Sequence, residues 1–504
     1  MDQLLRRDRT VVWHPASQMG EYEHEPPIVV DRAEGSRLIL ADGRSVIDGI
    51  ASWWCKSLGH RHPRVVRALA GQLERFEHHI TAGATNGPLV RLAERWLEHA
   101  NAPLPNWFVC AFFADNGSTG LEVALKMALH WQQLSGHPER QRFAALAGAY
   151  HGETAGALAL TDHPRYAAAY APMLIPPAVR LSGLPWRSGP SDPAWMDAQR
   201  EWPAIQAQLD PVAGELAAVV VEPVLQGAAG MRLYSPDLLR RLRRWCDAHG
   251  VLLIADEIAA GAWRLGHPLA SHLACSPRRS RGFLWPSNDP NGTRRPADPN
   301  VFWPPPAVID RGRSAMLRTP PAVDDPGGMP DLAVLGKGLT AGAVPASMVL
   351  ATARVAGAFY GRWDQDVAFL HSNTFAGNAL AVAAAHAVLD AVEQDRLPER
   401  IAAGGERLAA TLAEAAAQVR GFGPIRSCGM VAAADLLQPD GSPLPAGART
   451  AWKVHRACLD LGALLRPLGD TLYFMPPLTI GDDDIDELGG ILAAAVARVR
   501  RAGG

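Results

Sequence analysis

The sequence predicts an α/β fold built on a mainly parallel β-sheet. Residues 251–255 and 332–335 form short, wholly apolar runs, which are typical of parallel strands that are buried on both faces. From about residue 51 to residue 390, such runs alternate with helical patterns, as they do when helices connect parallel strands. We therefore expect one large domain centred on this sheet.

The segments around and within this region predict further elements. Residues 37–44 alternate and contain an Asp-Gly pair, which predicts an antiparallel hairpin with a tight turn. Residues 237–249 have the spacing of an amphipathic helix that leads into the strand at 251–255. Beyond residue 390 we expect helices over 401–419 and about 483–500, with short strands between them.

The composition is that of an ordinary globular enzyme, with 48% hydrophobic and 20% charged residues. A net charge of -2 gives no reason to expect nucleic acid or an anionic membrane as a partner. The first residues lack the apolar core of a signal peptide, and no apolar stretch approaches the ~20 residues of a membrane span. The six cysteines lack CxxC spacing, so we expect reduced thiols in the cytoplasm and no metal site.

A charged residue follows each of the two apolar strands. Asp256 ends the first run, and Lys337 comes just after the second. Open α/β sheets bind ligands at the carboxyl ends of their strands. A lysine and a carboxylate at this edge suit pyridoxal 5'-phosphate (PLP), because the lysine can attach the cofactor and the carboxylate can keep its ring nitrogen protonated. The alternative is a salt bridge between the two strand ends.

Other motifs in the chain fit the same cofactor. The small-residue turn at 115–120 opens a helical pattern and could bind a phosphate, although an ordinary helix N-cap would look the same. Tyr150 could lie on a flat ring, and Glu222 is a further acid at the end of an apolar run. Residues 370–378 offer hydroxyl and amide groups just before an Ala-rich helix. The order of these motifs along the chain favours a PLP site over coincidence.

With these motifs the chain resembles the class III aminotransferases, which are fold-type I PLP enzymes. Four further stretches resemble the branch of this family that acts in biotin biosynthesis: Trp13-His14-Pro15, Ser52-Trp53-Trp54, residues 226–231, and Arg466-Pro467-Leu468-Gly469 with Tyr473. The resemblance implies a large PLP-binding domain over residues 51–392. It also implies a small α+β domain formed by both termini, residues 1–50 and 393–504.

The resemblance also assigns roles to individual residues. Lys337 would hold the cofactor and move the proton, Asp256 would pair with the ring nitrogen, and Tyr150 would stack on the ring. Thr374 matches the position that reaches the phosphate of the neighbouring subunit, which implies a homodimer with a shared active site. The residues expected at the phosphate are Asn116, Gly117 and Ser118. Those expected in the substrate pocket are Trp53, Trp54, Arg264, Arg466 and Tyr473.

The activity implied by this resemblance is amino transfer to 8-amino-7-oxononanoate, which yields 7,8-diaminononanoate, with S-adenosylmethionine as the amino donor. Two departures from the family pattern leave an alternative open. Ala16 follows Trp-His-Pro where the family often has tyrosine, and Trp263 precedes Arg264 in a changed motif. The alternative is another class III ω-amine or diamine transaminase, with lysine for example as the donor.

A protein of a different functional class, a non-enzymatic PLP sensor fused to a DNA-binding module, is a further alternative. It would need an N-terminal helix-turn-helix with a basic face, and the non-basic residues before the large domain leave no room for one.

The segment from about 276 to 328 is rich in Pro, Arg and Gly and lacks hydrophobic periodicity. The family needs only a short connection between the strands that carry its Asp and its Lys. We therefore expect an insertion that leaves the sheet as a surface excursion, because loop length affects closure entropy only logarithmically. An active-site lid or a subunit-contact arm is the alternative, since Trp285, Phe302 and Trp303 would otherwise be exposed.

Overall fold

The fold is described from a computed structural model that covers residues 1–275, 325–445 and 447–503. The predicted insertion at 276–328 lies almost entirely outside these residues.

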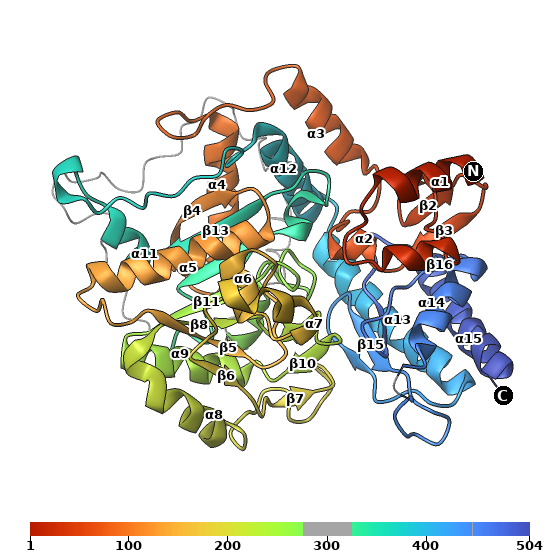
Figure 1. The fold of residues 1–504 in the computed structure, drawn as a ribbon. Coiled ribbons are helices and arrows are strands. Elements are labelled where there is room, and N and C mark those ends of the chain that lie inside the picture. The colour runs from red at the N-terminus through yellow and green to blue at the C-terminus, as the bar shows by residue number, and fades with distance from the viewer. Residues whose placement is uncertain (276–324, 446, 504) are drawn as a thin grey trace, which may run out of the picture.

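A seven-stranded sheet forms the centre of the large domain (Figure 1). Strand β13 runs antiparallel to both of its neighbours, β12 and β4, whereas the other pairs in the sheet are parallel. The predicted mainly parallel sheet is therefore confirmed. In spatial order the strands are β4 (Phe108–Ala114), β13 (Ser347–Thr352), β12 (Leu332–Leu335), β11 (Leu252–Asp256), β8 (Leu216–Val221), β5 (Arg142–Leu146) and β6 (Val179–Leu181).

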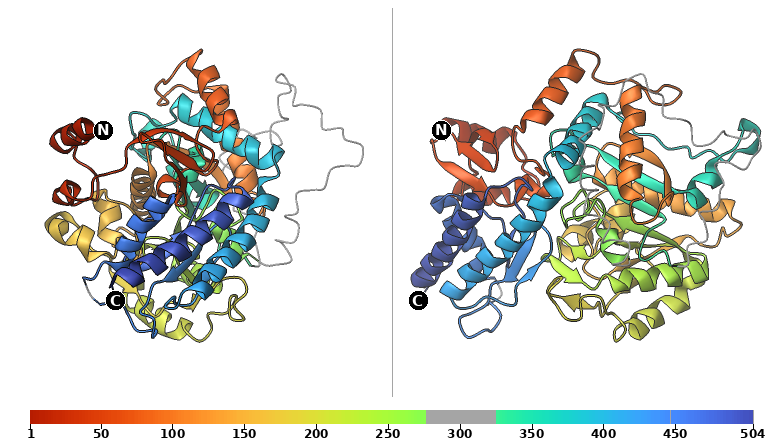
Figure 2. Two further views of the ribbon diagram at one scale, coloured as in Figure 1. Left: turned by 90° about the vertical axis from the view of Figure 1, so that its right-hand side faces the viewer. Right: turned by 180° about the vertical axis from the view of Figure 1, so that it is seen from behind.

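Helices pack on both faces of this sheet (Figures 1 and 2). Val220 and Ile254 point toward α5 (Gly117–Leu134) and share a buried cluster with its apolar side chains. Their neighbours Val219 and Leu253 belong to the cluster on the opposite face, with α9 (Asp237–His249). Successive strand residues thus meet different helices, which explains why these strands are apolar at every position.

Further helices complete the large domain. Helices α3 (Pro63–Leu73) and α4 (Gly87–Ala100) both pack against α12 (Ala379–Gln394), and α4 also contacts β4. The shorter helices are α6 (Ala155–Leu160), α7 (Pro164–Ala167), α8 (Trp202–Leu209) and α11 (Ala353–Ala356). A small antiparallel sheet of β7 (Trp186–Arg187), β10 (Arg232–Tyr234) and β9 (Leu225–Gln226) lies beside the main one.

The small domain combines both ends of the chain, and both termini lie on its side of the molecule (Figure 1). The N-terminal strands β1, β2 and β3 form the predicted antiparallel arrangement, and β16 from the C-terminal part joins β3 in parallel. Their bounds are β1 (Val30–Glu34), β2 (Arg37–Leu40), β3 (Ser45–Asp48) and β16 (Ala463–Leu464). The other elements are β14 (Arg426–Ser427), β15 (Ala432–Asp435), β17 (Thr471–Phe474), α13 (Leu397–Gln418), α14 (Thr450–Leu461) and α15 (Asp482–Gly503).

The predicted helices are present, with small shifts at their ends. Helix α9 has the predicted bounds, and α13 begins four residues before position 401, with proline in its first turn. Helix α1 (Asp2–Val11) is not predicted by the sequence analysis, and none of its side chains is buried. Among the described helices, none is both long and apolar enough to cross a bilayer.

Candidate active site

The two charged residues that follow the apolar strands leave the sheet at the same edge. Strands β11 and β12 are parallel neighbours, and Asp256, the last residue of β11, lies opposite Val334 of β12. Lys337 follows three residues later, at the start of a short 3-10 helix. The structure thus brings together the lysine and the carboxylate that the sequence analysis singles out.

Asp256 is held by a histidine that the sequence analysis does not identify. The carboxylate is 5% exposed, and its Oδ2 lies 2.8 Å from Nδ1 of the buried His151. Its Oδ1 accepts a hydrogen bond from the backbone N–H of Ile258 at 3.1 Å. These contacts fix both oxygens of the carboxylate. Within the part of the chain that the structure describes, His151 Nε2 has no hydrogen-bond partner.

The side chain of Lys337 lies beside an aromatic ring, with its Nζ 4.9 Å from the ring centroid of Trp54. Burial lowers the pKa of this amine, and the nearby charges of Asp256 and Glu222 oppose that shift. A lowered pKa makes more of the neutral amine present near neutral pH, and the neutral amine is the form that acts as a nucleophile or a base.

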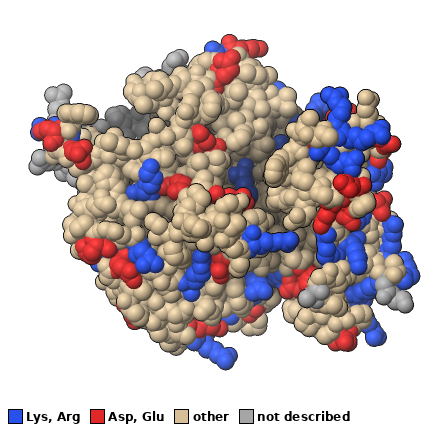
Figure 3. Space-filling view, in the orientation of Figure 1, with Lys and Arg blue, Asp and Glu red and all other residues tan. Residues whose placement is uncertain are grey.

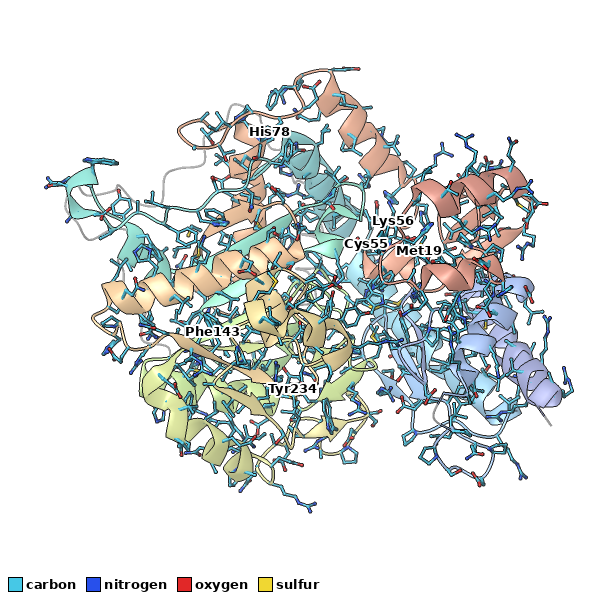
Figure 4. The ribbon with its side chains drawn as sticks, in the orientation of Figure 1. Met19, Cys55, Lys56, His78, Phe143 and Tyr234 are labelled. Carbon is cyan, nitrogen blue, oxygen red and sulfur yellow. The ribbon has the colours of Figure 1, made fainter. Side chains whose placement is uncertain are left out.

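Glu222, which the sequence analysis leaves without a definite role, holds the segment that carries Tyr150. It follows β8 and is buried, and its Oε2 accepts a hydrogen bond from the backbone N–H of Tyr150 at 3.0 Å. Its Oε1 accepts a second bond from the N–H of Gly227 at 3.1 Å. Burial raises the pKa of this carboxyl to about 7. Tyr234, labelled in Figure 4, donates its hydroxyl to the backbone carbonyl of Glu222 at 2.6 Å.

The N-terminus of α5 forms a cradle beside Lys337. Asn116 caps this helix, and its side chain accepts from the N–H of Thr119 at 3.1 Å. Gly117 lies against the segment that leads to Lys337, since a Cβ added to Gly336 would meet the Cα of Gly117 at 3.5 Å. The remaining first-turn N–H groups and the helix dipole favour an anion at this position.

Ser118 in the same turn connects α5 to the segment after Tyr150. Its hydroxyl lies 2.7 Å from Oγ1 of Thr154 and accepts from the backbone N–H groups of Glu153 and Thr154. Gly152 is required here, because a Cβ at that position would lie 2.4 Å from Oγ of Ser118, and its φ is +119°. The cradle is therefore a packed element and not an open loop.

A left-handed turn carries the two tryptophans that are expected in the substrate pocket. Residues Ala51–Trp54, labelled α2, have φ angles of 47°, 45°, 69° and 73°. Each such residue that is not glycine is strained by roughly 1–2 kcal/mol. Asp48 stabilises the turn, because its carboxylate accepts from Ser52 N at 2.9 Å and from Ser52 Oγ at 2.7 Å. The same carboxylate also bonds Nε2 of His60 at 2.9 Å.

The turn lies where the two domains meet. Figure 4 labels Cys55, directly after it, between the large domain and the small domain, and Figure 3 shows the surface hollowed there. Trp54 donates its Nε1 proton to the hydroxyl of Tyr473 at 3.0 Å. The ring of Trp53 lies under the guanidinium of Arg466, 5.1 Å from its centroid. Four of the expected pocket residues thus lie together.

The fifth expected pocket residue, Arg264, and the expected phosphate residue Thr374 have different surroundings. Arg264 is 3% exposed, and its Nη1 donates to the carbonyl oxygens of Pro476 and Met430 at 2.6 and 3.3 Å. Its Nη2 has no acceptor among the described residues, and burial lowers its pKa to about 9. Thr374 is exposed on the segment before α12. It lies next to Phe375, which is also exposed.

The family model for class III aminotransferases matches residues 19–277 and 321–496, which is most of the chain. The chain belongs to the class III aminotransferases. The match leaves out residues 278–320, which fall inside the predicted insertion.

Curated relatives extend over nearly the whole chain. A protein of Geobacter sulfurreducens named adenosylmethionine-8-amino-7-oxononanoate aminotransferase is 33% identical, over 95% of this chain and 94% of that protein. A protein of the same name from Nitratidesulfovibrio vulgaris is 31% identical, over 99% of this chain and 82% of its own length.

Solved structures agree on the fold. The Methanocaldococcus jannaschii enzyme of the same name has a TM-score of 0.80 at 24% identity, with 99% of each chain covered. A PLP-bound amine transaminase from an uncultivated Pseudomonas species has a TM-score of 0.78 at 28% identity, with 97% of this chain and 98% of that chain covered.

Class III aminotransferases depend on PLP, and this chain is a PLP-dependent transaminase. The residues fit the cofactor. Lys337 and Asp256 suit its aldehyde and its ring nitrogen, and the first turn of α5 suits its phosphate. His151 could have been suspected from the sequence only by its place next to Tyr150.

The strained turn leads to a first prediction. Replacing Asp48 with alanine leaves the partly buried N–H and hydroxyl of Ser52 unpaired, at a cost of up to about 1–3 kcal/mol for each group. We expect a lower melting temperature together with a raised KM for the amino acceptor, because Trp53 and Trp54 lose their fixed positions. Asp42→Ala, in the exposed β2–β3 turn, is the control. Unchanged acceptor kinetics in Asp48→Ala would show that the turn does not position the pocket.

Proposed function

We propose that the enzyme transfers an amino group to 8-amino-7-oxononanoate, giving 7,8-diaminononanoate in biotin biosynthesis, with S-adenosylmethionine as the amino donor. The names of the near full-length relatives support this reaction. Trp53, Trp54 and Tyr473 support it too, because an aliphatic keto acid needs an apolar channel with few polar groups.

The observation that most strongly supports this reaction is the set of contacts around the guanidinium of Arg466. Its guanidinium lies over the ring of Trp53, and no carboxylate or carbonyl among the described residues accepts a hydrogen bond from it. A half-buried arginine without a protein acceptor is suited to fork onto a substrate carboxylate. The long keto acid carries such a carboxylate at the end opposite its reacting carbonyl.

In the proposed reaction the catalytic residues transfer a proton and hold the cofactor in place. PLP, when bound, supplies the electron sink that makes the proton on the amine-bearing carbon of the substrate removable. Lys337 would hold the cofactor through its amine and, once released, would take up and return this proton. Asp256 would keep the ring nitrogen protonated. Glu222 holds the backbone of Tyr150 so that its ring can pack on the cofactor.

The amino donor is tested directly by a panel. The purified enzyme, 8-amino-7-oxononanoate and one donor at a time should give 7,8-diaminononanoate with S-adenosylmethionine. Ala16, in place of the tyrosine common in the family, is the feature that favours another donor. Product formation with lysine and none with S-adenosylmethionine would replace the proposed donor. If no donor gave product, 8-amino-7-oxononanoate would not be the amino acceptor.

Arg466→Ala should weaken binding of the keto acid without slowing the half-reaction with the amino donor. Loss of a charge pair of this kind typically costs about 2–3 kcal/mol, or about 30- to 150-fold in KM. Single-turnover kinetics of both half-reactions would measure this. Arg232→Ala is a matched control, because Arg232 also lies over a tryptophan, Trp186, at 5.5 Å. Equal losses in both half-reactions would make Arg466 a structural residue.

We also propose a homodimer in which Thr374 reaches the phosphate of the neighbouring subunit. The segment before Thr374 carries exposed apolar side chains, including Trp363 at 100% and Leu370 at 84% exposure. Such side chains are costly to leave in water, and a second copy would bury them. Sedimentation velocity tests the dimer, and a monomer at micromolar concentration would contradict it.

The cellular location and the domain limits complete the proposal. We propose a cytoplasmic enzyme, supported by free thiols at Cys55, Cys110, Cys246, Cys428 and Cys458.

We also propose that the small domain comprises residues 1–50 and 393–504 and that the large domain comprises residues 51–392.

A further inference from the structure

Arg466 has a second aromatic neighbour that neither the sequence motifs nor the proposed roles include. Its guanidinium lies 5.5 Å from the ring centroid of Trp452, in addition to the 5.1 Å contact with Trp53. Trp452 belongs to α14, in the small domain, whereas Trp53 belongs to the left-handed turn after β3. The arginine is thus contacted by rings from two separate elements.

Trp452 is itself fixed from several sides. Its Nε1 donates to Oε2 of Glu25 at 2.8 Å, and its ring lies 4.8 Å from that of His455. The guanidinium of Arg449 lies 5.2 Å from the same ring, and its two terminal nitrogens bond both carboxylate oxygens of Glu21. Arginine and tryptophan therefore alternate through Arg449, Trp452, Arg466 and Trp53, and two glutamates of the N-terminal segment hold one end of this row.

The backbone of Arg466 is tied to the same helix. His455 bonds through Nδ1 to the carbonyl oxygen of Leu465 at 3.0 Å. Burial lowers the pKa of His455 to about 4, so that at neutral pH the ring is uncharged and its Nδ1–H can donate. Helix α14 thus fixes the chain next to Arg466 as well as the ring beside its guanidinium.

A cation–π contact holds a guanidinium without using its N–H groups as conventional hydrogen-bond donors. These N–H groups point outward in the plane of the group, where a carboxylate can accept two of them. A mobile arginine side chain loses rotamer entropy when it binds a ligand. The surrounding rings already restrict the side chain of Arg466, so less of this entropy remains to be lost on binding. Holding Arg466 by ring faces therefore prepares it for a carboxylate without occupying its donors.

We propose that Trp452 is a positioning residue for substrate, which holds Arg466 in the orientation that binds the carboxylate of the amino acceptor. Glu25 fixes Trp452 in turn, so that the N-terminal segment contributes to acceptor affinity. This inference rests on the proposed role of Arg466. It extends that role to residues of α14 and of the segment before β1.

The first test separates positioning from general support of the fold. Trp452→Leu should raise KM for the keto acid by about 5- to 30-fold, the range of one partly desolvated cation–π contact. The turnover number and the donor half-reaction should stay as in the wild type. Trp452→Phe keeps a ring and should recover most of the affinity. Equal losses in kcat and in both half-reactions for the Leu and Phe variants would overturn the proposal.

The second test asks whether Trp452 acts through Arg466. In an Arg466→Ala background, Trp452→Leu should change KM for the keto acid no further, because the group that it positions is gone. Glu25→Ala should give a smaller increase in KM than Trp452→Leu, and Glu25→Gln, which can still accept from the indole, should be close to wild type. Additive effects of the two substitutions at 452 and 466 would contradict the proposal.

The third test does not depend on the identity of the keto acid. Calorimetric titration of the holoenzyme with octanoate measures the binding of an aliphatic carboxylate that lacks the reacting carbonyl and is not turned over. Trp452→Leu should lower the affinity for octanoate by a similar factor, about 5- to 30-fold. Trp186→Leu, which removes the ring under Arg232 instead, should bind it as the wild type does. Unchanged octanoate affinity in Trp452→Leu, or no octanoate binding by the wild type, would overturn the inference. Binding of octanoate without turnover of 8-amino-7-oxononanoate would leave the inference standing and refute the proposed substrate.

Discussion

Lys337→Ala should bind PLP without attaching it and should lose transamination by at least about 10³-fold, within the range that loss of a positioned general base gives. The reason is geometric. Lys337 leaves the sheet beside Asp256, at the edge where the first turn of α5 offers an anion site. Its amine has a pKa lowered by burial, which increases the neutral form that must accept the proton.

Two measurements check this expectation. Borohydride reduction followed by peptide mass mapping should place the cofactor on residue 337 in the wild type and on no residue of Lys337→Ala. Single-turnover kinetics with an amino donor should show no transfer in the variant. Lys453→Ala, an exposed lysine of α14, is the control and should behave as the wild type does. Appreciable turnover by Lys337→Ala would refute the assignment of the base.

The central sheet could be predicted from the sequence because its strands carry a local signal. Val219, Val220, Leu253 and Ile254 are apolar in succession, since helices cover both faces. The reversed direction of β13 could not be predicted, because an apolar run has the same pattern in either direction. Helix α1 is ten residues long and buries none of its side chains, so neither its length nor its packing gives a strong signal in the sequence.

That Asp256 and Lys337 lie at the same edge of the sheet could be predicted, because each follows a strand with a local apolar signal. The site was not predictable where function depends on contacts between distant segments. His151 bonds Asp256 across 105 positions. Asp48 holds a left-handed turn that no local propensity favours, since Ala51–Trp54 contains no glycine. In such cases the side chain is ordinary and only the tertiary packing gives it a role.

Asp256→Asn should lower the rate of both half-reactions by about 10²–10⁴-fold, the range for removal of one buried electrostatic or acid–base contribution. The amide keeps the shape of the carboxylate, and its oxygen can still accept from Nδ1 of His151 or from the N–H of Ile258. The fold should therefore survive while the charge that keeps the ring nitrogen protonated is lost. Asp256→Glu retains the charge but displaces it by one methylene in a buried site, so a smaller loss is expected.

The experiment compares kcat/KM of both half-reactions and the melting temperature for the two variants. Asp247→Asn is a matched control, because Asp247 pairs with Arg243 on the helix that leads into β11 and lies away from the site. If the charge is what matters, Asn should be much slower than Glu although both melt close to the wild type. A near wild-type rate for Asp256→Asn would mean that His151 and Asp256 form a structural pair, and that another group keeps the ring nitrogen protonated.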